Sequence, residues 1–184
     1  MPGGARSPLT RRPRVVCIPA RLTGPWRDGP LKGAGTWMNE DDVALRNLTY
    51  GRFVELGRAP TAAEIAADAR LDEAEVMTGW ERLQAEHALV LSPVTGDIRM
   101  ASPFSGVPTA HRVQAAGRWW YGNCAWDAFG ICAALHDDGR IETSCPDCGE
   151  AVKIAVRDQC PDDESLFFHC LIPATQWWDD IVLT

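Results

Sequence analysis

Residues 37–101 carry three helix signals followed by a hairpin signal, and this order constrains the fold more than any other feature of the chain. Thr61 to Glu64 has the composition of a capping box, which opens a short helix, and Asp72 can cap the next helix. Two short apolar runs on either side of the turn at 93–96 predict two strands. The helical apolar positions are Val43, Leu45, Leu48, Phe53, Val54 and Leu56 before the capping box, and Val76, Trp80 and Leu83 after Asp72. Three helices followed by a β-hairpin are typical of a winged-helix unit.

Residues 102–184 hold strand and turn signals around one helix. Proline and glycine mark a connecting loop near its start, and Asp137 to Gly139 marks a turn. The expected elements are a strand through Val113 and Trp119–Tyr121, a helix from Cys124 to Leu135, and strands near Ile141–Thr143, Ala151–Val156 and Leu166–Ile172. We therefore expect an α+β chain, with a winged-helix-like N-terminal unit followed by a small mixed α/β catalytic-type domain of antiparallel strands.

The charge is distributed unevenly along the chain. Residues 1–36 contain seven basic residues against Asp28 alone and are rich in proline and glycine, so we expect a flexible basic arm. The whole chain nevertheless carries a net charge of −7. The expected third helix is acidic, and an acidic helix repels the phosphate backbone of DNA. This argues against nucleic acid as a partner, although a winged-helix transcriptional regulator remains an alternative. No apolar run is long enough to span a membrane or to form a secretory signal, which predicts a cytoplasmic protein without membrane contact.

Six of the seven cysteines follow residue 120, which favours metal or thiol chemistry over a disulfide framework. Cys124 and Asp127 lie three residues apart where a strand is expected to meet a helix. Residues at this spacing share a helix face, and the positive end of the helix dipole favours the thiolate form of Cys124. A thiolate beside a carboxyl group can bind a soft metal and transfer a proton. The alternative is a structural role for both residues, in which Cys124 is packed in the interior and the negative charge of Asp127 only stabilises the positive end of the helix dipole.

Cys145 and Cys148 have the spacing of one half of a zinc site. Tetrahedral zinc needs four ligands, and Cys160, His169 or Cys170 would have to complete the set. A structural turn and a redox dithiol are the alternatives. Strand alternation puts His169 and Cys170 on opposite faces, so only one can face a pocket. We expect Cys132 to pack in the core as a small residue.

Four stretches together resemble the organomercurial (alkylmercury) lyase family. They occur in order, and the resemblance extends over about residues 37–184 when the helical unit is included. The stretches are Pro103–Thr109, Asn123–Ala128, Ser144–Gly149 and Trp177–Ile181. The resemblance implies protonolysis of a carbon–mercury bond, which gives a hydrocarbon and Hg(II). It assigns mercury binding to Cys124 and proton transfer to Asp127, which would also be a weaker mercury ligand, and it gives Cys145 a structural role.

The resemblance also implies a second catalytic cysteine, which it places after Trp177–Ile181 and beyond Thr184. We therefore expect a domain that is incomplete at its C-terminus and slow at cleavage, unless Cys170 substitutes as a mercury ligand. The expected partners are an organomercurial, low-molecular-weight thiols and a mercuric reductase, with no required cofactor. A thiol-based mercury or zinc binding module without cleavage activity is the alternative.

Overall fold

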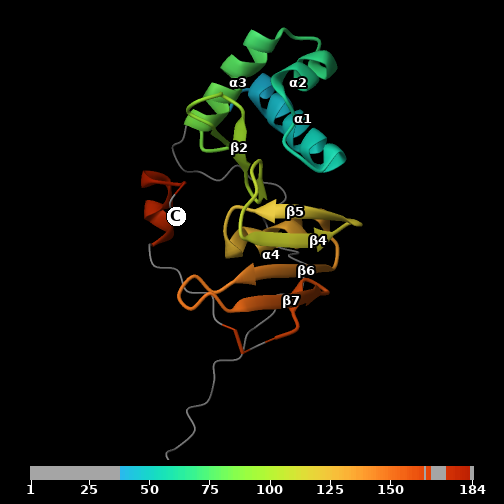
Figure 1. Ribbon diagram of the computed structural model, residues 1–184. Coiled ribbons are helices and arrows are strands. Elements are labelled where there is room, and N and C mark those ends of the chain that lie inside the picture. Colours follow the sequence, from blue (N-terminus) through green and yellow to red (C-terminus); the bar gives the residue numbers. More distant parts are fainter. Residues whose placement is uncertain (1–37, 164, 167–172, 183–184) are drawn as a thin grey trace, which may run out of the picture.

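The computed structural model describes residues 38–163, 165–166 and 173–182 of the chain. Three helices form one end of the described molecule, and an antiparallel sheet with a further helix forms the other (Figure 1). This confirms the α+β class. The arm predicted for residues 1–36, most of the strand predicted at 166–172, and Cys170 lie outside the described residues. The winged-helix assignment and the proposed domain boundaries stay predictions.

The helical unit consists of α1 (Glu40–Leu56), α2 (Ala62–Ala69) and α3 (Glu73–Ala85). Both caps predicted from the sequence form. The Thr61 Oγ1 accepts from the N–H of Glu64 at 3.2 Å, while the Glu64 carboxylate accepts from the N–H of Thr61 at 2.8 Å. Asp72 caps α3 in the same reciprocal way with Glu75. Local hydrogen bonding therefore defines where α2 and α3 begin.

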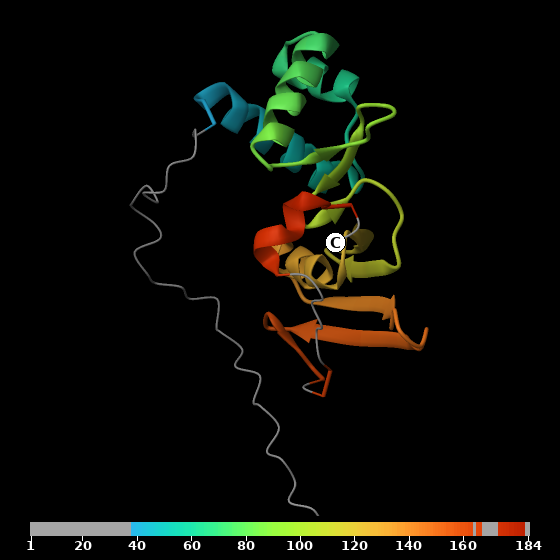
Figure 2. The same ribbon diagram turned by 90° about the vertical axis from the view of Figure 1, so that its left-hand side faces the viewer.

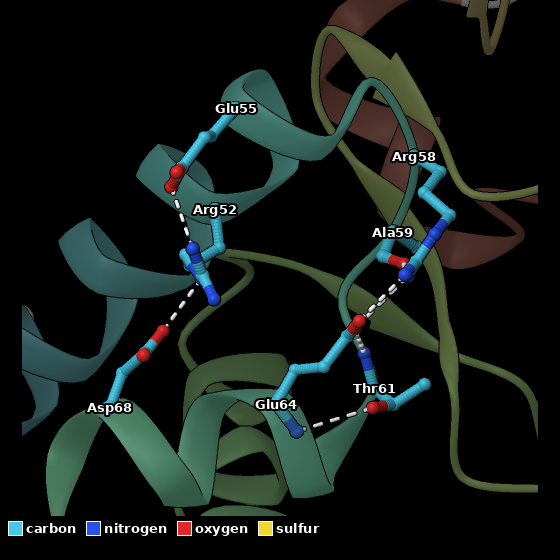
Figure 3. A network of polar contacts seen from close by, with 7 residues as sticks. All are labelled: Arg52, Glu55, Arg58, Ala59, Thr61, Glu64 and Asp68. Carbon is cyan, nitrogen blue, oxygen red and sulfur yellow. Dashed lines mark hydrogen bonds and ion pairs between the residues drawn. The ribbon is translucent and has the colours of Figure 1, made fainter.

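Ion pairs connect the ends of α1 and α2 around the first of these caps (Figure 3). The Arg52 guanidinium lies 2.8 Å from Glu55 and 2.6 Å from Asp68. Arg58 lies 2.6 Å from Glu64, so one carboxylate serves both the cap and an ion pair. The Arg58 hydrogen bond is the main reason that the pKa of Glu64 falls to about 2.

The buried stripe of α1 is narrower than the sequence predicted. Leu45 and Phe53 are buried, but Val43 and Val54 are 38% and 37% exposed. These two valines are eleven residues apart, about three helical turns, so they lie on the same side of α1, turned away from the core.

Within the described residues, eight strands form one antiparallel sheet in the order β1-β2-β3-β5-β4-β6-β7-β8. Alternate residues of the central strands are buried, among them Val113, Trp120 and Ile141. Helix α4 (Ala125–Leu135) packs on this buried face through Ala128, Ile131 and Cys132. The strands are β1 (Val90–Leu91), β2 (Ile98–Ala101), β3 (Phe104–Ser105), β4 (His111–Ala115), β5 (Arg118–Gly122), β6 (Gly139–Ser144), β7 (Ala151–Arg157) and β8 (Cys160–Pro161).

The single strand predicted through Val113 and Trp119–Tyr121 is wrong, because the chain reverses within it. Ala116 and Gly117 have φ values of 50° and 73°, and β4 and β5 pair on either side of them. Two successive residues with positive φ form the tight turn that suits a hairpin. Only Gly117 signals this turn in the sequence, since alanine rarely adopts such a backbone. The connecting loop predicted after residue 102 likewise contains the short strand β3.

The hydrophobic core is continuous from the helical unit into the sheet. The rings of Phe53 and Phe104 stack with centroids 5.3 Å apart, and Phe104 contacts Trp120 at 5.2 Å. On the surface, the Arg118 guanidinium donates to the carbonyl oxygen of Glu55 at 2.8 Å. The 3-10 helix η2 (Ala174–Asp179) lies level with this junction in both views (Figures 1 and 2). Its Trp178 ring stacks on His87, with ring centroids 4.1 Å apart.

None of the helices among the described residues is long and apolar enough to cross a membrane.

Candidate functional site

Cys124 is the N-cap of α4, one residue before the helix begins. Its backbone is extended, and its Sγ accepts a hydrogen bond from the N–H of Asp127 at 3.5 Å. A thiol group in this position faces the unpaired N–H groups and the positive end of the helix, which stabilise negative charge on sulfur. The predicted strand-to-helix junction is confirmed, and the side chain of Cys124 is half-buried.

Gly122 makes the tight junction before Cys124 possible. A Cβ atom on this residue would lie 2.9 Å from the backbone nitrogen of Ala128 and 3.2 Å from the carbonyl oxygen of Cys124. Strand β5 and the first turn of α4 therefore approach each other more closely than a side chain allows. The end of β5 is also held by Thr109, whose hydroxyl donates to the carbonyl oxygen of Gly122 at 2.6 Å.

Asp127 lies in the first turn of α4, and Asn123 fixes its carboxyl group. The Asn123 Nδ2 donates to Asp127 Oδ2 at 2.8 Å and more weakly to the carbonyl oxygen of Phe104 at 3.4 Å. Burial raises the pKa of Asp127 from its ordinary value, and the hydrogen bonds from Asn123 act in the opposite direction. The result is a carboxyl group that holds its proton more readily than an exposed aspartate does.

Asn123 belongs to the candidate site, although the sequence analysis gave it no functional role. Its Oδ1 atom is buried, and no hydrogen-bond donor reaches it from any residue that the structure describes. A buried acceptor without a donor is uncommon, so this oxygen is available to a ligand or to a protonated carboxyl group. The signal in the sequence was its position directly before Cys124, where it also matches the resemblance.

The site faces the helical unit. Tyr50 of α1 is close enough to Asp127 for the carboxylate charge to help raise the tyrosine pKa, although burial is the larger cause. The Tyr50 hydroxyl donates to the carbonyl oxygen of Ala88 at 2.7 Å. Beside it lies a hollow of about 330 Å³, whose polar and aromatic lining includes Arg46, His87 and Trp178. A larger open depression of about 790 Å³ lies among α1, α2 and α3 and is lined by none of the predicted site residues.

Cys145 and Cys148 lie in the tight turn that joins β6 to β7. Hydrogen bonds from Cys145 N–H to the Glu150 oxygen (2.8 Å) and from Gly149 N–H to the Cys145 oxygen (2.9 Å) close this turn. Gly149 has a φ of 74°, which favours glycine there. The Cys145 sulfur accepts hydrogen bonds from the N–H of Cys148, the N–H of Asp147 and the Cys148 thiol, and these lower the Cys145 pKa. Both thiols are free.

The remaining cysteines are placed differently. Cys132 is fully buried and packs in the core as predicted, and burial raises its pKa to about 11. Cys160 is disulfide-bonded, which removes it as a thiolate ligand for zinc. Among the described residues, no three His, Cys, Asp or Glu side chains lie together in a way that would hold a metal ion. The roles predicted for Cys124, Asp127, Cys145 and Cys148 therefore stay predictions, and Cys170 lies outside the described residues.

Comparison with known proteins finds a matching family model and a similar solved structure. The family model described as alkylmercury lyase matches residues 104–184, a segment that contains Asn123, Cys124, Asp127 and the Cys145–Cys148 turn. The fold is similar to that in the crystal structure of the mercury-bound form of MerB2, with a TM-score of 0.55 and 21% sequence identity. That match covers 68% of this chain and 60% of the MerB2 chain. A sequence search of curated proteins gave no match.

Proposed function

We propose that this chain, a member of the alkylmercury lyase family through residues 104–184, cleaves carbon–mercury bonds by protonolysis and releases Hg(II) and a hydrocarbon. The observation that carries the proposal is a helix-capping thiol in the matched segment that accepts a hydrogen bond from the backbone N–H of Asp127, a residue whose own carboxyl group is partly buried. Mercury is a soft metal, and thiolates are the protein ligands that soft metals prefer.

In the first step, the Cys124 thiolate binds the mercury of R–Hg–X, and the group X leaves with its electron pair. The helix terminus supports this step, because its N–H groups favour the thiolate over the neutral thiol. A second thiolate on the same mercury makes the carbon more basic. Cys170 is the predicted source within the chain, and a low-molecular-weight thiol is the alternative source.

In the second step, the protonated Asp127 carboxyl group donates its proton to the carbon. The carbon–mercury bond breaks, its electron pair forms the new carbon–hydrogen bond, and Hg(II) stays on sulfur. Burial suits Asp127 to this step because it keeps a larger share of the carboxyl groups protonated. Asn123 acts as a positioning residue that holds Asp127 toward the substrate.

The test is turnover of phenylmercury in the presence of excess thiol, with benzene measured in the headspace. We expect Cys124→Ser and Asp127→Asn each to reduce the rate by about 100-fold or more, the scale of a lost proton donor. Asp158→Asn is the matched control for the second variant, since Asp158 is exposed and distant in sequence. Unchanged turnover in Cys124→Ser would exclude the proposal, and loss of turnover in Cys170→Ala would identify the second thiolate.

The same assay decides between the lyase and a thiol module that only binds mercury, because that module would retain intact phenylmercury without forming benzene. A zinc module has less support, since Cys160 is not a free thiolate and the described residues provide no complete ligand set. A transcriptional regulator is disfavoured by the acidic face of α3, which carries Glu73 and Glu75 in its first turn. The mercuric reductase and the cytoplasmic location stay predictions.

A further inference from the structure

We propose that Cys145 and Cys148 form a second soft-metal site, a two-thiolate clamp for Hg(II) that is separate from Cys124. Both are free thiols three residues apart in one turn, which the hydrogen bond from the Gly149 N–H to the Cys145 carbonyl oxygen closes at 2.9 Å. Cys148 is exposed and Cys145 is half-buried, which leaves the pair open to a ligand from solvent.

The turn presents its sulfur atoms on a fixed backbone. The two closing hydrogen bonds, at 2.8 and 2.9 Å, hold the loop between β6 and β7 in one conformation. A metal that binds here therefore meets preformed ligands, and little conformational freedom is lost on binding.

The number of ligands selects the metal. Zinc takes four ligands in a tetrahedral site, and no group of three or more suitable side chains occurs among the residues that the structure describes. Hg(II) is satisfied by two thiolates in a linear arrangement, and its softness favours sulfur over oxygen and nitrogen. A pair of thiols without further ligands thus suits Hg(II) better than zinc.

The turn lies at the same end of the sheet as Cys124. Gly122, at the end of β5, pairs with His111 at the start of β4. The His111 ring in turn forms a 2.8 Å hydrogen bond with Thr143, next to the end of β6. Two strand spacings, roughly 10 Å, therefore separate the strand ends that lead to Cys124 and to Cys145.

This position suits the clamp to receive Hg(II) from Cys124, a role that rests on the proposed function. The binding itself does not depend on it. When Hg(II) arrives as a complex with two small thiolates, the Cys145 and Cys148 thiols replace them, and two small thiols leave with the two protons. No oxidation or reduction takes place, and all atoms are accounted for.

The experiment titrates reduced Cys124→Ser/Cys160→Ser protein, in which the disulfide of Cys160 cannot become a second chelating pair, with HgCl₂ alone and dialyses it against excess 2-mercaptoethanol. A monothiol removes mercury from single cysteines but competes poorly with a chelating pair. We expect one retained equivalent of Hg(II), measured by mass spectrometry of the metal. Adding Cys145→Ser, Cys148→Ser or both changes should each abolish the retention of this one equivalent of Hg(II). Ser144→Ala is the control and should still retain it.

Retention of the equivalent in the double variant, or loss in only one of the two single variants, would overturn the proposal. Recovery of the pair as a disulfide after anaerobic purification would do the same and indicate a redox dithiol. In a parallel titration with ZnCl₂ in place of HgCl₂, one retained equivalent of zinc would contradict the assignment to Hg(II). Because HgCl₂ contains no carbon–mercury bond, a protein without lyase activity can still pass this test, and an active lyase can fail it.

Discussion

At Asp127, burial and hydrogen bonding act on one carboxyl group in opposite directions. Burial raises its pKa, whereas the Asn123 amide stabilises the ionised form and lowers it. The balance decides how much of the proton donor is available near neutral pH.

Replacing Asn123 by leucine should raise the pKa of Asp127 further, because it removes the side-chain hydrogen bond that favours the carboxylate and leaves only the one from the backbone. The protonated form is the donor, so the loss of turnover at alkaline pH should move to higher pH. The check is an NMR titration of the Asp127 carboxyl carbon alongside a pH–rate profile. A downward shift in either measurement would contradict the proposed role of Asn123.

Gly122→Ala should lower stability by about 1–3 kcal/mol, since the added methyl group meets backbone atoms that cannot rotate away. Turnover should fall as well, because the strain displaces Cys124. Gly51→Ala is the matched control. It lies in the exposed middle of α1 with no atom near its Cβ position, so it should be neutral or stabilising by up to about 1 kcal/mol. Urea unfolding measures both.

The sequence predicts site residues that are close together along the chain. It does not predict contacts that depend on how distant elements pack. The spacing of Cys124 and Asp127 identifies the candidate pair without a structure. The interactions of Asn123 with Phe104 and of Gly122 with Ala128 depend on how β3 and α4 pack, so no spacing rule could reveal them.

At the scale of elements, the capping of α2 shows what local rules can predict. Thr61→Ala should cost about 1 kcal/mol, the usual contribution of an N-cap, because the Glu64 N–H loses its acceptor. Thr61→Ser should be close to neutral, since it keeps the hydroxyl group. Thermal unfolding of both variants provides the comparison, and equal destabilisation by the two changes would show that the methyl group matters rather than the cap.

Local rules failed for the hairpin of β4 and β5. Its turn contains Ala116 in a left-handed conformation, which the pairing of the two strands enforces. Tertiary contacts also decide which apolar residues of α1 are buried, and Val43 and Val54 remain exposed for that reason. Element types could thus be predicted more securely than strand ends or buried faces.

At the scale of the molecule, the helical unit and the sheet share one core. Phe104 is 2% exposed and contacts both Phe53 of α1 and Trp120 of β5. Phe104→Ala should therefore lower stability by about 3–5 kcal/mol. Far-ultraviolet circular dichroism and tryptophan fluorescence should report a single, coincident transition in both proteins. Two separated transitions in the unmodified protein would show that the two parts fold independently.

At the start of α4, the residue that would cap the helix best differs from the residue that the proposed reaction needs, which is Cys124. Serine is among the preferred N-cap residues, while the Cys124 sulfur accepts its hydrogen bond at a long 3.5 Å. The Cys124→Ser protein should therefore unfold at a higher temperature than the unmodified one while it loses turnover. A metal on the sulfur competes for the same lone pairs that cap the helix. Occupancy should then appear as faster amide hydrogen exchange at Asp127, which makes the helix end a local reporter of whether the site is filled.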